Sequence, residues 1–170
     1  MSHPLVLALF DDAAAAARAA RELRTLGVPR ERVSIVARSH DEEGQIAQAA
    51  EASPGSEIED SRPASRLGEL SAHLIAAVAL VMPGIGPIVA DGPLAAGLGE
   101  AAGHLAGGIR RTLQRAGLDR VSSERWESRI EQGAVLVGAH VTTPEEAKEV
   151  LVRNGASETA LGTWHDSGDR

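Results

Sequence analysis

Two Glu–His pairs stand in an otherwise apolar stretch in the middle of the chain, and they are the residues best suited to chemistry. Glu69 and His73 are four residues apart, and so are Glu100 and His104. If the two segments form antiparallel helices that turn near Gly86, each glutamate lies level with a histidine of the other helix. Two carboxylates and two imidazoles suit Zn, Fe or Mn, so one hypothesis is a divalent transition-metal site.

The same four residues have a simpler interpretation, which we favour. Their spacing is i,i+4, whereas the di-iron helical bundles use Glu-x-x-His at i,i+3. The pairs are then solvated or interface ion pairs, which become charged near pH 6 as the histidines protonate. The sequence therefore predicts no resident cofactor, with the metal site as the alternative.

Other kinds of chemistry find less support in the sequence. The chain has no cysteine, which excludes disulfides, thiolate metal sites and a thiol nucleophile. Ser71 and Ser122 occur in no nucleophile-elbow motif, and His140 on an apolar predicted strand is better explained by packing. The segment PGIGP lacks the Lys and Ser or Thr of a phosphate-binding loop. We expect a protein that is not an enzyme.

Net charge and composition limit the classes of partner that we expect for this protein. The net charge is -7, and arginine carries all but one of the basic charges. No basic stripe is interleaved with aromatic residues, so nucleic acid is excluded as the expected partner. Residues 41–60 hold seven acidic residues and no Lys or Arg, which is typical of a solvated connector. The first ten residues lack a basic, signal-like start, and we expect a cytoplasmic protein.

Two blocks of similar order lie at the ends of the chain. The first has an apolar strand over 5–10, an alanine-rich helix capped by Asp11 and Asp12 and ended by Gly27, and a strand over 33–37. The second has a strand over 134–141, a helix from Pro144 to about 154, and a weaker strand over 158–164. Thr143 and Glu146 are expected to form a capping box there.

These blocks predict the fold class, which is α+β. We expect a ferredoxin-like β-α-β-β-α-β sheet with a long helical-hairpin insertion between the second and third strands. The first and third strands are expected in the centre, with the second and fourth as edges. The predicted organisation is one domain with four parts: a first β-α-β half at 1–39, an acidic connector at 40–65, the hairpin at 66–116, and a short helix with the second half at 117–170.

The predicted hairpin comprises helices over 66–82 and 93–114, joined by the turn-rich PGIGPIVADGP. Small residues recur every four positions on one face of each helix, which allows close approach of two backbones. They are Gly68, Ala72, Ala76, Ala95, Gly99, Gly103 and Gly107. This face packs the two helices of the hairpin against each other, or it joins two subunits. Both hold if the other apolar face of the hairpin forms the oligomer. We expect a homo-oligomer, most simply a dimer.

Two further expectations concern the membrane and the tryptophans. Residues 74–90 are uncharged, but Pro83 and Pro87 interrupt them, so peripheral membrane association is an alternative that we do not favour. A short amphipathic helix is predicted over 123–132, with Ser122 and Ser123 as candidate N-caps. Trp126 on this helix and Trp164 are expected to cover the sheet, although an exposed Trp126 could anchor a partner.

Four segments together resemble a known family: LALF followed by DD, VSIVAR, the run from PGIGPIVADGPLAA to RRTLQRAGL, and ERWESRIEQGAVLVGAHV. They are similar to the bacterial heat-induced general stress protein family, over residues 5–155. The resemblance implies a stress-associated protein of unknown biochemistry, and it supplies no site residues. Family members are often labelled membrane proteins for their glycine-rich middle. The middle of this chain departs from that pattern, because the two Glu–His pairs interrupt it.

Overall fold

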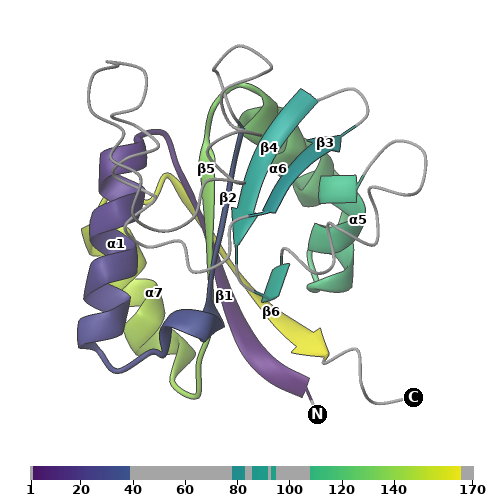
Figure 1. Ribbon diagram of the computed structural model, residues 1–170. Coiled ribbons are helices and arrows are strands. Elements are labelled where there is room, and N and C mark those ends of the chain that lie inside the picture. The colour runs from purple at the N-terminus through teal and green to yellow at the C-terminus, as the bar shows by residue number, and fades with distance from the viewer. Residues whose placement is uncertain (1, 39–77, 83–85, 92, 95–107, 166–170) are drawn as a thin grey trace, which may run out of the picture.

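The computed structural model describes residues 2–38, 78–82, 86–91, 93–94 and 108–165. They form an α+β fold in which one antiparallel sheet lies between two layers of helices, α1 with α7 on one face and α5 with α6 on the other (Figure 1). The strands are β1 (Ser2–Phe10), β2 (Val33–Arg38), β3 (Val78–Met82), β4 (Gly86–Asp91), β5 (Val135–His140) and β6 (Glu158–His165). The helices are α1 (Ala13–Thr25), a 3-10 turn (Arg30–Arg32), α5 (Gly108–Arg115), α6 (Arg120–Glu131) and α7 (Pro144–Arg153).

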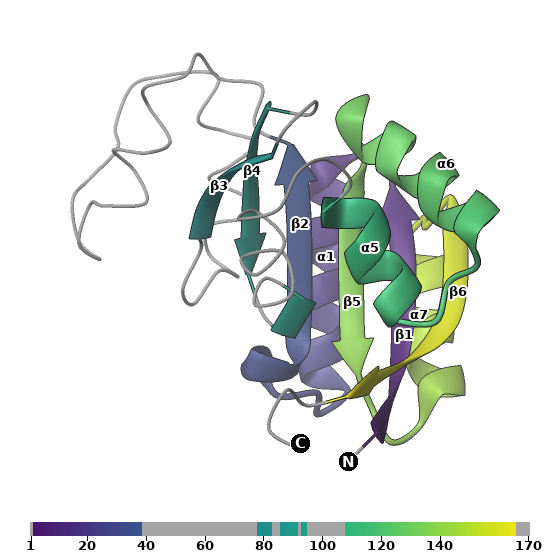
Figure 2. The same cartoon turned by 90° about the vertical axis from the view of Figure 1, so that its right-hand side faces the viewer.

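The sheet has the strand order β3-β4-β2-β5-β1-β6, and every neighbouring pair is antiparallel. The two strands predicted to be central, β1 and β5, pair with each other from Leu5 opposite His140 to Phe10 opposite Val135. Both strands are buried on both faces, which explains why their sequences are continuous apolar runs. The face-on view in Figure 2 shows α5 and α6 lying across these strands.

The predicted elements of the two end blocks are confirmed. Asp12 is the N-cap of α1, and its carboxylate accepts hydrogen bonds from the amides of Ala14 and Ala15, both at 3.2 Å. Gly27 follows the helix with φ of 98°, a left-handed conformation that glycine adopts without strain. Gly155 does the same after α7.

Two predicted caps differ in the structure. Thr143 is the N-cap residue of α7, as predicted. Its hydroxyl donates to the Glu146 carboxylate at 3.3 Å and caps no backbone amide, so the prediction of a capping box is wrong. Helix α6 begins at Arg120, three residues earlier than predicted, and its N-cap is Asp119 instead of Ser122 or Ser123. Asp119 accepts from the Ser122 amide at 2.9 Å, since a carboxylate is a strong acceptor for a helix N-terminus.

The middle of the chain contains a β-hairpin where helix and turn were predicted. Residues 78–82, expected to end a helix, form β3, and the segment expected as a turn contains β4. Strand β4 pairs with β2 from Ile35 opposite Asp91 to Arg38 opposite Ile88, so β2 is not the predicted edge. The physical reason is that β2 would otherwise present unpaired backbone groups, and the short apolar run VALV accommodates a strand as readily as a helix.

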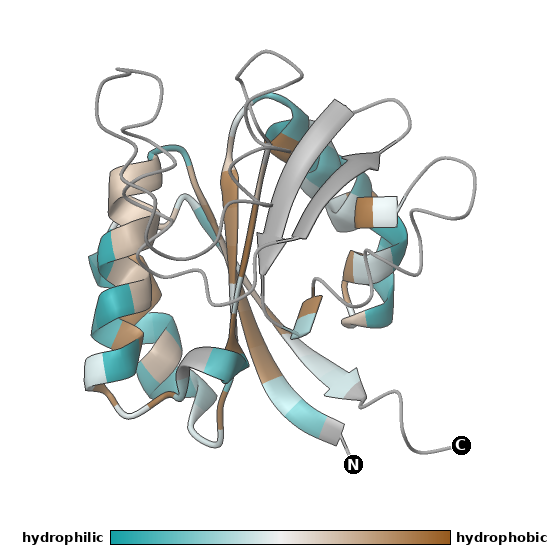
Figure 3. Ribbon diagram, in the orientation of Figure 1, coloured by the Kyte–Doolittle hydropathy of each residue, from teal (hydrophilic) through white to brown (hydrophobic). Residues whose placement is uncertain are grey.

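Two hydrophobic cores fill the space on the two faces of the sheet, and β2, β5 and the inner part of β1 between them are largely hydrophobic (Figure 3). On the α1–α7 face, six small alanines of α1 and α7 let the helices approach strand residues such as Val6 and Phe10 closely. On the α5–α6 face, Trp126 is 2% exposed and Trp164 8% exposed. The prediction that both tryptophans cover the sheet is confirmed, and Trp126 is not an exposed anchor.

Candidate functional site

The residues that the sequence singled out for metal binding or self-association lie outside the described ranges. These are Glu69, His73, Glu100 and His104, together with Gly68, Ala72, Ala76, Ala95, Gly99, Gly103 and Gly107. The acidic connector also falls outside. Within the residues that the structure describes, no three His, Asp or Glu side chains are grouped so that they could hold a metal ion. No helix in the same ranges has both the length and the apolar character needed to cross a bilayer.

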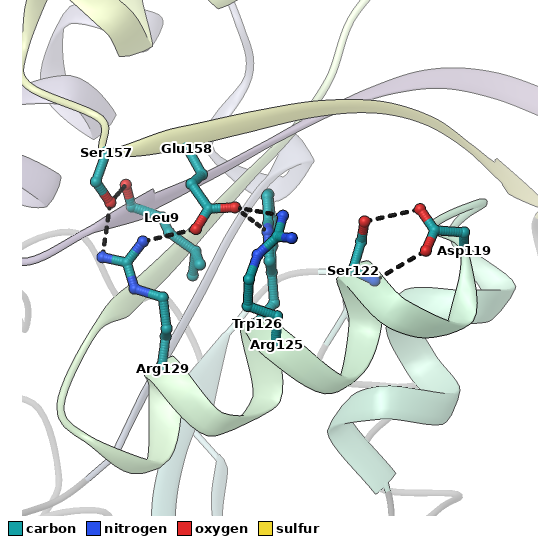
Figure 4. A network of polar contacts seen from close by, with 8 residues as sticks. All are labelled: Leu9, Asp119, Ser122, Arg125, Trp126, Arg129, Ser157 and Glu158. Carbon is teal, nitrogen blue, oxygen red and sulfur yellow. Dashed lines mark hydrogen bonds and ion pairs between the residues drawn. The ribbon is translucent and has the colours of Figure 1, made fainter.

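The densest polar cluster in the described structure surrounds Glu158, at the start of β6 (Figure 4). Its carboxylate accepts hydrogen bonds from three side chains of α6: Arg125 Nη2 at 2.9 Å, Trp126 Nε1 at 2.8 Å and Arg129 Nη1 at 2.8 Å. Residues 125, 126 and 129 share one side of a helix because of its 3.6-residue period. Glu158 therefore binds one side of α6 at three points.

Arg129 extends this cluster to β1 and to the start of α1. Its Nη2 donates to Ser157 Oγ at 2.9 Å and also to the Asp11 carboxylate. Ser157 in turn donates to the Leu9 carbonyl from its hydroxyl at 3.1 Å and from its amide at 2.8 Å. One guanidinium thus contacts Asp11, which is 118 residues away in the chain, as well as Ser157 and Glu158, which are 28 and 29 residues away. We call Asp11, Arg125, Trp126, Arg129, Ser157 and Glu158 the Glu158 cluster.

The cluster sets the charge states of its central residues. Partial burial raises the pKa of Glu158, but the hydrogen bonds from Arg125, Arg129 and Trp126 outweigh it and leave this pKa below its ordinary value. Burial lowers the pKa of Arg129, and the bonds to Glu158 and Asp11 more than compensate, so the net shift is upward. Both residues therefore carry full charge at neutral pH. A carboxylate held ionised by three donors is poorly suited to general acid chemistry.

A second set of acidic side chains joins α5 to α6. Glu127 accepts from the backbone amide of Arg110 at 2.9 Å, which places a negative charge at the N-terminus of α5. Glu124 bridges Arg110 at 3.4 Å and Arg120 at 3.0 Å. Arg110 of α5 and Arg120 of α6 are thus paired with Glu124 within this helical layer, and these contacts position the two helices.

Sequence reasoning identified Trp126 as a core residue and expected Asp11 to cap α1 together with Asp12. In the structure Asp12 alone is the N-cap, and Asp11 instead binds Arg129 in a cluster that the sequence did not reveal. Arg125 and Arg129 on either side of Trp126, four residues apart, were the available signal on the helix. The sequence near these arginines gives no signal that Glu158 is their acceptor, because α6 and β6 meet only when α6 packs across the sheet.

Replacing Glu158 with Gln tests how the cluster stabilises the fold. The variant keeps the shape but loses the charge, so we expect a loss of about 2 kcal/mol in the free energy of unfolding at pH 7. Because the folded pKa of Glu158 is depressed, its contribution is present above the unfolded pKa of about 4.3 and is lost as pH falls through the folded pKa. Urea unfolding at several pH values measures this.

The difference in free energy of unfolding between wild type and Glu158→Gln should therefore shrink steadily on acidification below about pH 4. Glu149→Gln, at an exposed position of α7, is the matched control and should differ from wild type by less than about 0.5 kcal/mol. A Glu158→Gln penalty that stays constant from neutral to acidic pH would show that the charge is not what the cluster uses.

Comparisons with known protein families, with curated proteins and with solved structures give no match for this chain.

Proposed function

We propose that this protein is a non-enzymatic, stress-associated structural or interaction protein that self-associates, most simply as a dimer. The observation that carries the proposal is the strand β3, which ends the described sheet on one side and has the sequence VALVM. An apolar end strand presents backbone donors and acceptors that a second copy of the same strand satisfies.

The charge distribution supports a second copy as the partner. From residue 67 to 109 the sequence has no Lys or Arg and only three acidic residues, so β3 lies within a long segment of very low charge. Isologous pairing of such a segment brings few like charges together, because the rest of the chain carries all 17 Lys and Arg and 21 of the 24 Asp and Glu. The small-residue positions predicted for self-association flank β3 and β4 in the sequence.

We also infer that β1, α1, β2, β5, α7 and β6 form a ferredoxin-like unit. Its support is the order β2-β5-β1-β6, with α1 and α7 on the same face of the sheet (Figure 1). In this interpretation the opposite face of the unit receives α5 and α6 from the segment between β2 and β5. Because both faces are covered, recognition falls to the sheet edges and to the middle segment.

Native mass spectrometry of untagged, detergent-free protein tests the self-association. We expect wild type to be dimeric or larger without bound metal, and Leu80→Lys in β3 to raise the dissociation constant at least about tenfold, because a charge on an end strand opposes pairing. Leu161→Lys is the matched control, since Leu161 lies in β6 at the opposite end of the sheet and is 55% exposed.

Two results would contradict the proposal. A wild-type monomer across a wide concentration range would remove self-association. A stoichiometric transition-metal mass that disappears in a His73→Ala, His104→Ala double variant would move the Glu–His site to first place. The stress association has its own test, because protein abundance in the native host should rise after heat shock, and an unchanged level would contradict it.

A further inference from the structure

The β3–β4 hairpin is held on the sheet along one short ladder. Strand β4 pairs with β2 over four residue pairs, and β3 pairs with β4. The chain then returns to the core at Leu94, which is fully buried although it follows directly on this hairpin. The attachment of the hairpin therefore has two parts, the β2–β4 ladder and the site where Leu94 is seated.

The seat of Leu94 is formed by two small residues opposite each other on neighbouring strands. Ser34 of β2 pairs with Gly138 of β5, and both are on the face covered by α5 and α6. A Cβ atom on Gly138 would lie 2.9 Å from Leu94 Cδ1 and 3.2 Å from Leu7 Cδ2. A Cβ here would force the Leu94 side chain to shift, so glycine at this position lets Leu94 pack closely on the sheet.

A hydrogen bond adds direction to this contact. The amide of Leu94 donates to Ser34 Oγ at 3.1 Å, and Ser34 is fully buried. Burying a hydroxyl on a central strand lowers stability unless the hydroxyl is hydrogen-bonded. Because Ser34 Oγ accepts from the Leu94 amide, this bond also fixes the position of the Leu94 backbone over the sheet. The two bonded residues are sixty positions apart in the sequence.

We propose that Leu94, seated over the Ser34–Gly138 pair, is the anchor that positions the β3–β4 hairpin, and that withdrawing this anchor releases the hairpin as a unit while β1, β5 and their helices stay folded. The part of this inference that concerns self-association rests on the function proposed above, because β3 is the strand that pairs with a second copy. The anchor itself does not depend on it.

Hydrogen exchange measured by mass spectrometry on the full-length protein tests the anchor. Ser34→Ala removes the acceptor and leaves a buried amide without its bond, so amides of β4 should exchange about tenfold faster. Amides of β1 and β5 should stay within about twofold of wild type. Leu94→Ala removes the side chain as well, and its local effect should exceed that of Ser34→Ala in the same peptides.

Ser123→Ala is the matched control. Ser123 is equally buried, but within the described residues its hydroxyl has no hydrogen-bond partner, so its removal should leave β4 exchange unchanged. Unchanged β4 exchange in Ser34→Ala, or an equal rise across β1, β4 and β5, would overturn the anchor. If β4 exchange rises in Ser34→Ala while Leu80→Lys leaves the dissociation constant unchanged, the anchor stands and self-association through β3 does not.

Discussion

Replacing Trp126 with Ala is expected to lower the free energy of unfolding by about 4 kcal/mol, one of the two largest single losses we foresee. The indole is 2% exposed and lies in the core between α6 and the sheet. Its removal leaves a cavity in this core, and it also takes one of three donors from Glu158. Urea unfolding followed by circular dichroism measures the loss.

Trp126→Phe separates the two contributions. It keeps most of the apolar contact but has no indole N–H, so we expect a loss of about 1–2 kcal/mol. If the alanine variant is too unstable to purify, the phenylalanine variant still reports the donor to Glu158. A loss below about 1 kcal/mol in Trp126→Ala would mean that α6 does not depend on this side chain for its place on the sheet.

Gly162→Ala is expected to cost about 3 kcal/mol for a different reason. A Cβ at this position in β6 would lie 2.0 Å from the carbonyl oxygen of Ala116, which is backbone that cannot rotate away. The same carbonyl accepts from the Thr163 amide at 3.0 Å, so the turn after α5 lies directly against β6. The substitution must displace the turn, break this hydrogen bond and disturb the buried Leu118.

Thermal and urea unfolding measure the loss of stability in Gly162→Ala, and the same substitution at a second glycine gives the comparison. Gly155→Ala is the matched control, because nothing lies within 4 Å of its Cβ position and only its φ of 98° disfavours alanine. We expect about 1 kcal/mol there. A loss at Gly162 no larger than the loss at Gly155 would show that the approach of Ala116 does not require glycine in β6.

Local signals in the sequence identified the end blocks well. Helix α1 begins after Asp12 and ends before Gly27, and α7 begins at Pro144, because caps, proline and glycine act on their immediate neighbours. The apolar run of β1 indicated a strand buried on both faces, and the apolar run of β5 indicated a central strand. The start of α6 was predicted too late, because Asp119 caps this helix in place of the two serines that we expected.

The sequence by itself thus determined the α+β class, the identity of the four end-block strands and the burial of both tryptophans, since periodicity and capping are encoded within about ten residues. Only the tertiary structure decided that VALVM is a strand, because β2 offers it a ladder through β4. It also decided that Glu158 receives the side chains of α6 and that Leu94 lies over Gly138. The contacts of Glu158 with α6 join residues 29 to 33 positions apart, and their energy exists only once the sheet has brought the segments together.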